Sequence, residues 1–176
     1  MKKLLIVLIL LLFTGCTLKD IDNTPTKQVE TFLNNYQTLD KKVLKDLDLV
    51  IAKQNNFNNE QKERYRKILK KHYQNLTYEI KDETVNGNRA NVEVEIEVTD
   101  FYKALKELKN NNEITNNEEY INNQLDKLEK AKDTVKYTLN LTLTKNKNGD
   151  WILDDINDIE EKKILGTYDM NPVSWT

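Results

Sequence analysis

Apolar residues recur at two different spacings along this chain, and the first spacing is helical. In the stretch "TPTKQVETFLNNY" they follow the i, i+3, i+4, i+7 pattern of one helix face: Val29, Phe32, Leu33 and Tyr36. Thr24 ahead of Pro25 is typical of a helix N-terminus, because threonine caps free amides and proline fits the first helical position. The pattern predicts a helix that begins at residue 25.

The same spacing predicts two more helices. The stretch "TLDKKVLKDLDLVIAK" carries one apolar stripe, made of Leu39, Val43, Leu44, Leu47, Val50 and Ile51. An asparagine-rich loop, "QNNFNNEQ", follows, and Asn58 with Gln61 three residues later resembles a capping box. The third stripe consists of Tyr65, Ile68, Leu69, Tyr73 and Leu76.

The spacing changes to two after residue 76, which indicates strands. We predict a strand in "LTYEIKDETV" with Tyr78 and Ile80 on one face, then a tight turn at "NGN", where glycine takes the positive φ. Strict alternation in "RANVEVEIEVTD" predicts a second strand with one buried face, made of Ala90, Val92, Val94, Ile96 and Val98. Glu93, Glu95 and Glu97 share the other face, and period two favours the solvated side of a sheet over a cation site.

Helical spacing then returns for a pair of helices, and a second hairpin follows. The first of the pair carries Phe101, Ala104, Leu105 and Leu108, and after the polar break "NNNEITNN" the other carries Tyr120, Ile121, Leu125 and Leu128. The hairpin is "TVKYTLNLTLTKNKNGDWILDDI", in which "KNKNGD" turns the chain. The order predicts an α+β fold: N-terminal helices on a four-stranded antiparallel sheet, with a helical pair inserted between two hairpins.

Three stretches resemble the small exported lipoproteins of the nuclear transport factor two-like superfamily. They are "TPTKQVETFLNNYQTLDKK", "ANVEVEIEVTDFYKAL" and "AKDTVKYTLNLTLTKNKNGDWILDDI". The resemblance covers roughly residues 24–165 and implies a cystatin-like α+β cone, in which a curved sheet wraps around helices and can enclose a pocket. Enzymatic members of the superfamily place histidine, aspartate or tyrosine inside the cone, but no such catalytic set maps onto this chain residue by residue.

The chain opens with "MKKLLIVLILLLFTGC", a basic start followed by the apolar run Leu4–Phe13. Ten residues of helix rise about 15 Å, half of a bilayer's hydrocarbon core, so the run predicts an export signal and not a membrane span. The residues Phe13, Thr14 and Gly15 before Cys16 resemble the lipobox of bacterial lipoproteins, with phenylalanine where leucine is usual. Cleavage between Gly15 and Cys16 is therefore expected, with acylation of the Cys16 thiol.

A lipidated Cys16 determines the expected organisation and location of the protein. Residues 1–15 are the lipoprotein signal peptide, 16–23 a lipidated tether, 24–165 the α+β domain and 166–176 a C-terminal tail. Two or more acyl chains suffice for stable anchoring, so we expect a lipid anchor at the extracytoplasmic face of the cell membrane. The abundance of lysine and asparagine suggests an AT-rich, Gram-positive source. Cys16 is the only cysteine, so no disulfide is expected.

Charge and composition exclude one class of partner. The formal net charge is −2, and it becomes −4 once Lys2 and Lys3 leave with the signal. The charges are mixed along the chain and form no basic stripe, so nucleic acid is not an expected partner. No motif in the chain predicts a cofactor or a metal centre, and mean hydropathy is low, at −0.74.

His72 and an acidic segment near the C-terminus are further candidate sites. His72, the only histidine, lies beside the third stripe and lacks an obvious nucleophile or orienting carboxylate, so it is predicted to be a partly exposed helix residue. The acidic segment Asp150–Glu161 lacks the spacing of an EF-hand loop, which leaves weak calcium binding as an open alternative: Asp150, Asp154, Asp155, Asp158, Glu160 and Glu161.

Tyrosines supply the binding hypothesis. Tyr36, Tyr65, Tyr73 and Tyr137 lie on apolar stripes and are expected to line the core or a pocket. The sequence therefore favours a non-enzymatic, membrane-tethered module that binds a small apolar ligand or an envelope protein. The alternatives are a hydrolase or isomerase built around His72 and a structural accessory domain of an envelope complex.

Overall fold

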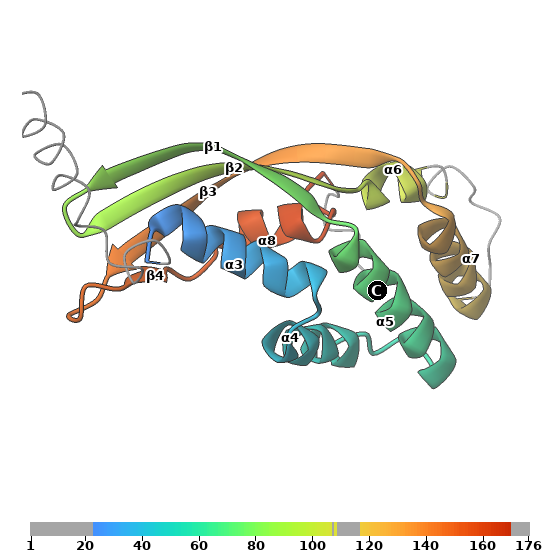
Figure 1. Cartoon of the computed structure of the whole chain (residues 1–176). Coiled ribbons are helices and arrows are strands. Elements are labelled where there is room, and N and C mark those ends of the chain that lie inside the picture. Colours follow the sequence, from blue (N-terminus) through green and yellow to red (C-terminus); the bar gives the residue numbers. More distant parts are fainter. Residues whose placement is uncertain (1–22, 107, 109–116, 170–176) are drawn as a thin grey trace, which may run out of the picture.

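The computed structural model describes residues 23–106, 108 and 117–169 and shows an α+β fold (Figure 1). Within these residues, the first elements are three helices: α3 (Pro25–Gln37), α4 (Lys41–Ala52) and α5 (Asn59–Gln74). The rest of the described elements are β1 (Thr77–Asn86), β2 (Arg89–Thr99), α6 (Phe101–Lys106), α7 (Asn117–Lys130), β3 (Thr134–Lys145), β4 (Trp151–Leu153) and α8 (Asp158–Ile164). The predicted order is confirmed, and α8 is an addition to it.

The helix starts follow the sequence signals. Thr24 accepts a hydrogen bond from the backbone amide of Lys27, at 3.1 Å, with Pro25 at the first helical position of α3. Asn58 and Gln61 form a capping box at the start of α5. Each cap satisfies amides that have no partner inside the helix, so the boundaries are set locally.

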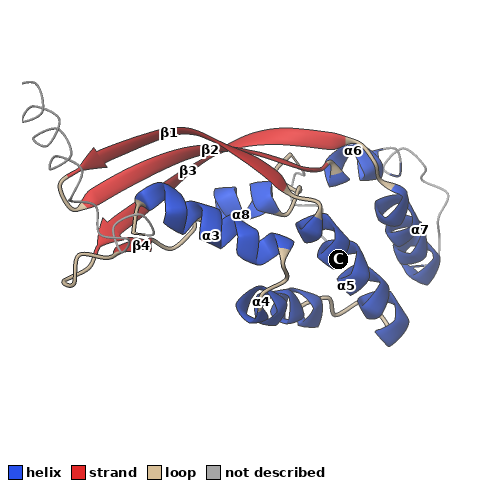
Figure 2. Cartoon of the chain, in the orientation of Figure 1, coloured by secondary structure: helices blue, strands red, loops and turns tan. Residues whose placement is uncertain are grey.

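The four strands form one antiparallel sheet in the order β1-β2-β3-β4, and it curves over the helices (Figure 2). Gly87 makes the β1–β2 turn with a φ of +60°. Residues on alternate positions of β2 are buried, as predicted: Ala90, Val92, Val94, Ile96 and Val98. Their partners on β3 include Leu139 and Leu141, so the face toward the helices is a continuous apolar layer.

The buried residues form two clusters that divide the molecule. One lies between the sheet, α3 and α8, and includes Val29, Leu33 and Ile164. The other joins α4, α5, α6 and α7 through residues such as Leu47, Leu69 and Leu125. Figure 1 shows the corresponding arrangement, with α3 and α8 beneath the sheet and α4, α5 and α7 farther from it.

Helix α8 covers the part of the β3 edge that β4 leaves unpaired. Strand β4 pairs with β3 only at Leu143–Lys145. Farther along β3, Glu160 accepts a hydrogen bond from the Asn140 amide at 3.2 Å, and Lys163 donates to the Thr138 carbonyl at 2.6 Å. Side chains of α8 therefore occupy backbone groups that an exposed edge would offer to another strand.

Both ends of the described domain are held by hydrogen bonds. Asn23 donates to the Gly149 carbonyl at 3.0 Å and accepts from the Trp151 amide at 2.9 Å. At the other end, Asp169 accepts from the Tyr137 hydroxyl at 2.8 Å. Residues 166–169 of the predicted tail thus contact the domain. Among the helices that the structure describes, none is both long and apolar enough for a bilayer crossing.

Candidate functional site

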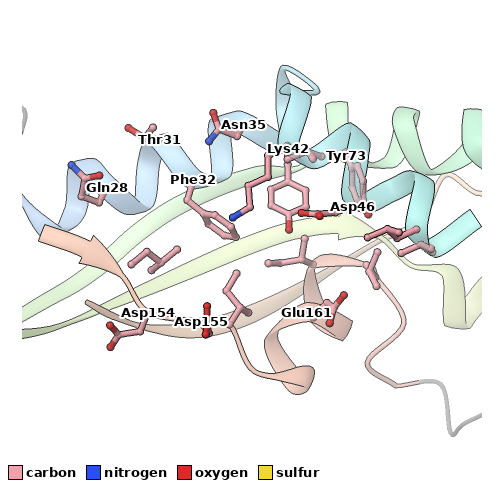
Figure 3. Close-up of a pocket in the computed structure, with 18 of the residues that line it drawn as sticks. Gln28, Thr31, Phe32, Asn35, Lys42, Asp46, Tyr73, Asp154, Asp155 and Glu161 are labelled. Carbon is pink, nitrogen blue, oxygen red and sulfur yellow. The ribbon is translucent and has the colours of Figure 1, made fainter. Parts of the chain in front are cut away.

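A pocket of about 590 Å³ lies between α3, α4, β4 and α8 (Figure 3). This volume is within the range of small-molecule sites, roughly 300–1,000 Å³. A second hollow, of about 640 Å³ between α6 and α7, is lined mainly by charged surface residues such as Lys103, Lys127 and Asp133. The first pocket combines apolar and polar walls and is the candidate site.

Four aromatic residues line the pocket: Trp151 of β4, and Phe32, Tyr36 and Tyr73, whose packed rings form its inner wall. Phe32 and Tyr36 come from one face of α3, one turn apart, and their ring centroids are 5.3 Å apart in an edge-to-face arrangement. Tyr36 meets Tyr73 of α5 in the same way, at 5.1 Å. Edge-to-face pairs are favourable ring geometries, so α3 and α5 fix this wall in place.

The mouth of the pocket carries apolar side chains that face solvent. Leu49 of α4 is 55% exposed and Ile152 of β4 is 53% exposed, and both line the pocket. Large apolar side chains exposed beside a concave site are typical of binding surfaces, because burying them on a ligand is favourable. They extend the apolar wall outward.

Charged groups surround this apolar surface. Four carboxylates and two lysines line the pocket: Asp46, Asp154, Asp155, Glu161, Lys42 and Lys53. Figure 3 shows Asp46 and Lys42 projecting from α4 and Glu161 from α8 on the other side. The excess of carboxylates gives the pocket a negative balance at neutral pH.

The two tyrosine hydroxyls lie within the field of these carboxylates. Burial, and then the charges of Glu161 and Asp46, raise the pKa of Tyr36 to about 12. The pKa of Tyr73 is raised further, first by burial and then by Tyr36, Tyr65, Glu161 and Asp46. Both phenols therefore stay protonated and offer hydrogen-bond donors at neutral pH.

The structure brings together two of the four tyrosines predicted as a binding set. Tyr36 and Tyr73 line the pocket. Tyr65 is buried in the helical cluster, where its ring packs on Phe57 at 5.7 Å. Tyr137 lies on β3, where it binds Asp169. Tyr65 and Tyr137 are thus separate from this pocket, because their apolar stripes face other elements.

The prediction that His72 is partly exposed is wrong, because its side chain is only 2% exposed. Its Nε2 lies 2.8 Å from the Ile164 carbonyl oxygen, and its ring stacks on Phe101 at 4.6 Å. Helix α8, which the sequence did not predict, covers the ring. Burial outweighs the backbone hydrogen bond and lowers the pKa of His72 to about 4.

The contacts of His72 differ from those of a catalytic base. The Ile164 carbonyl accepts only, so Nε2 carries the proton, and buried Nδ1 has no hydrogen-bond partner within the described residues. No carboxylate orients the ring there. The histidine joins α5 to the end of α8 and lies outside the tyrosine pocket.

Most of the acidic residues that are candidates for cation binding are exposed or half-buried, but Glu160 is buried and its carboxylate accepts from the Asn140 amide. Glu93, Glu95 and Glu97 lie on the solvent face of β2 but are half-buried rather than fully exposed, and Glu95 accepts from Lys136 at 2.9 Å. Their cross-strand neighbours cover them in part. Among the described residues, no three acidic, histidine or cysteine side chains gather to hold a metal ion.

Several residues of the pocket were missed by the sequence analysis, although two left a signal. Leu49 is apolar but lies off the stripe of its helix, next to Val50. Ile152 is the middle of three consecutive apolar residues, so alternation turns it away from Trp151. Both patterns indicate exposed apolar side chains. Asp46 and Glu161 had no signal, because only the fold brings α4 and α8 together.

Comparison with known proteins identifies no relative: no family model, curated sequence or solved structure matches this chain. The resemblance to the nuclear transport factor two-like superfamily therefore stays a prediction. Phe13, Gly15 and Cys16 lie outside the described residues, so lipidation stays a prediction as well.

Proposed function

We propose that this protein is a membrane-tethered, extracytoplasmic binding module that takes a small, largely apolar ligand into the tyrosine pocket. The observation that carries the proposal is the pocket itself, a cavity of about 590 Å³ with an inner wall of Phe32, Tyr36 and Tyr73. Exposed Leu49 and Ile152 continue its apolar surface to the mouth.

The path of the chain supports access to a membrane-proximal ligand. The described domain begins at Asn23, which is bonded beside β4, and Gln28 on the first turns of α3 lines the pocket. The proposed anchor, Cys16, precedes Asn23 by seven residues. An extended chain spans at most about 3.3–3.6 Å per residue, so the pocket would work within a few tens of ångströms of the bilayer.

The contacts of His72 give the enzymatic alternative no comparable support. A general base must reach a proton on its substrate, whereas the buried His72 ring is hydrogen-bonded to a backbone carbonyl. Binding needs only the cavity and its walls.

A ligand titration tests the binding proposal. We expect the full chain to bind phenylpropanol, an uncharged probe with an apolar body, in an NMR titration. The variant Leu49→Ser removes exposed apolar surface at the mouth and should weaken binding several-fold. Val85→Ser is the matched control, because Val85 is 50% exposed but lies at the end of β1, outside the pocket. Equal affinity for the two variants, or no binding by the wild type, contradicts the proposal.

A labelling experiment tests the anchor. The Cys16→Ser variant keeps a similar shape but is unable to form a thioether, so it should lose fatty-acid label and leave the membrane fraction. Thr17→Ser changes the next residue as a control and should label like the wild type. Wild-type protein recovered soluble with a free thiol would overturn the assignment.

A further inference from the structure

We propose that the ligand of the tyrosine pocket is an organic cation, an apolar body with one ammonium group held between Asp46 and Glu161. This inference rests on the proposed function, because it names the chemical class of the ligand that the same pocket takes.

Two carboxylates approach the pocket from separate elements. Asp46 comes from α4 and Glu161 from α8, and both act on the same two phenols, Tyr36 and Tyr73. All four residues line the pocket. Figure 3 shows Asp46 beside the aromatic wall and Glu161 on the side formed by α8.

Both carboxylates are available to a ligand. Within the part of the chain that the structure describes, neither the Asp46 nor the Glu161 side chain forms an ion pair or hydrogen bond. This contrasts with Glu95, which pairs with Lys136, and with Asp126, which pairs with Arg64 at 2.6 Å. Two unpaired like charges beside one cavity repel each other, and a bound cation relieves that repulsion.

The aromatic wall suits the same ligand. Tyrosine rings attract cations through the negative charge of their faces, and the attraction strengthens where water is excluded. Tyr36 and Tyr73 meet edge to face at an interplanar angle of 85°, so their ring planes are nearly perpendicular. A ligand whose ammonium group lies between the carboxylates would place its apolar body against this wall of Phe32, Tyr36 and Tyr73.

Two lysines of the pocket would repel a bound cation. Removing a lysine and removing a carboxylate should therefore change the affinity for a cation in opposite directions. Lys42 and Lys53 line the pocket with the four carboxylates, so a cation is attracted by the balance of the charges. Lys42 lies one turn before Asp46 on α4, and the two are not bonded as an ion pair. Removing Lys42 should therefore strengthen binding of a cation, whereas removing the carboxylates should weaken it.

The experiment compares three probes that share one apolar body. The full chain is titrated with phenylpropylammonium, phenylpropanol and phenylpropionate, and dissociation constants are measured by NMR at low and high salt. We expect the ammonium probe to bind most tightly and the carboxylate probe most weakly. High salt should weaken the binding of the ammonium probe and leave the affinity for phenylpropanol nearly unchanged.

Charge variants then locate the ammonium group. The double variant Asp46→Asn with Glu161→Gln should lose about two- to thirtyfold in affinity for phenylpropylammonium, the range for two partly exposed pairs. Its affinity for phenylpropanol should not change, which also shows that the pocket is intact. Lys42→Gln should bind the ammonium probe more tightly than the wild type. Glu60→Gln with Glu119→Gln, which removes two exposed carboxylates on α5 and α7 outside the pocket, is the control for net charge.

The outcomes separate this inference from the proposed function. If phenylpropanol binds and the three probes have equal affinity, the proposal of a cationic ligand is wrong, and the proposal that the pocket binds an apolar ligand is retained. The same holds if the pocket double variant and the Glu60→Gln, Glu119→Gln control lose equal affinity for the ammonium probe, because the attraction is then a property of the whole surface. If none of the probes binds, both proposals are wrong.

Discussion

Helix α3 separates two regions that use aromatic and aliphatic side chains differently. Its Val29 and Leu33 point to the sheet and are fully buried in the core beneath β2 and β3. Its Phe32 and Tyr36 are only partly buried, and they line the pocket beside α4 and α8. One apolar stripe of the sequence thus supplies both a closed core and an open site.

Polar groups distinguish the two regions. The sheet core pairs buried apolar residues of β2 with buried apolar residues of β3. The pocket places unpaired Asp46 and Glu161 next to Tyr36 and Tyr73. Charges without partners need water or a ligand, so the two walls of this pocket do not close on each other.

The largest expected effect is in the closed core. Ile96 is fully buried on β2 opposite Tyr137, so Ile96→Ala should lower the free energy of unfolding by about 2–5 kcal/mol. Urea unfolding measures the change. Val85→Ala at the exposed end of β1 is the control and should stay within about 0.5 kcal/mol. A small loss for Ile96→Ala would mean that this face does not support the fold.

The next largest expected effect is a loss of stability in acid, which is caused by the buried His72. Its pKa is lowered to about 4 in the folded chain, against 6.5 when unperturbed. Between pH 6.5 and about pH 4, His72 is therefore protonated in the unfolded chain but neutral in the folded chain. Stability is therefore lost as the pH falls through this window, by about 3 kcal/mol in total.

A variant separates His72 from the carboxylates that also titrate. His72→Gln is unable to gain a proton and can still donate to the Ile164 carbonyl. The wild type should lose stability relative to this variant as the pH falls from about 6.5 to about 4, in urea titrations at several pH values. A difference between the two chains that is constant with pH would contradict the lowered pKa.

A smaller effect is expected where α8 closes against the core. Gly166, after α8, has a φ of +65°, and a Cβ there would lie against the Thr99 carbonyl oxygen and 2.9 Å from His72 Cε1. Gly87 has a similar φ, +60°, with open space around it. Gly166→Ala should cost about 1–3 kcal/mol more than Gly87→Ala, since only the first adds a steric clash to the shared backbone strain. Equal losses in thermal unfolding would show that the packing around Gly166 can adapt.

Much of the fold could be predicted because its signals are local. The cap at Thr24, the capping box at Asn58 and the period-two alternation from Ala90 to Val98 are read within a few residues, and the structure confirms all three. Helix α8 was missed because seven residues give a short pattern, although its acidic first turn is a signal for a helix start. Its boundaries depend on the Asn157 cap and on packing against β3.

The site was less predictable, since it depends on elements far apart in the sequence. Tyr36 and Tyr73 were expected to line a core or a pocket, but no sequence pattern tells which tyrosines meet. Asp46 and Glu161 are separated by the whole sheet in the chain and come together only through α8. The burial of His72 follows from the same helix.

The smallest expected effect on stability is at the pocket mouth, where it defines the contrast with Ile96. Leu49 is 55% exposed on α4, so Leu49→Ser removes little buried surface and should change the free energy of unfolding by no more than about 0.5 kcal/mol. The same variant should weaken phenylpropanol binding several-fold, because a ligand would cover that side chain. Urea unfolding and the NMR titration, made on one preparation, measure the two effects together. A large loss of stability would place Leu49 in the core, and unchanged affinity would leave the mouth without a role in binding.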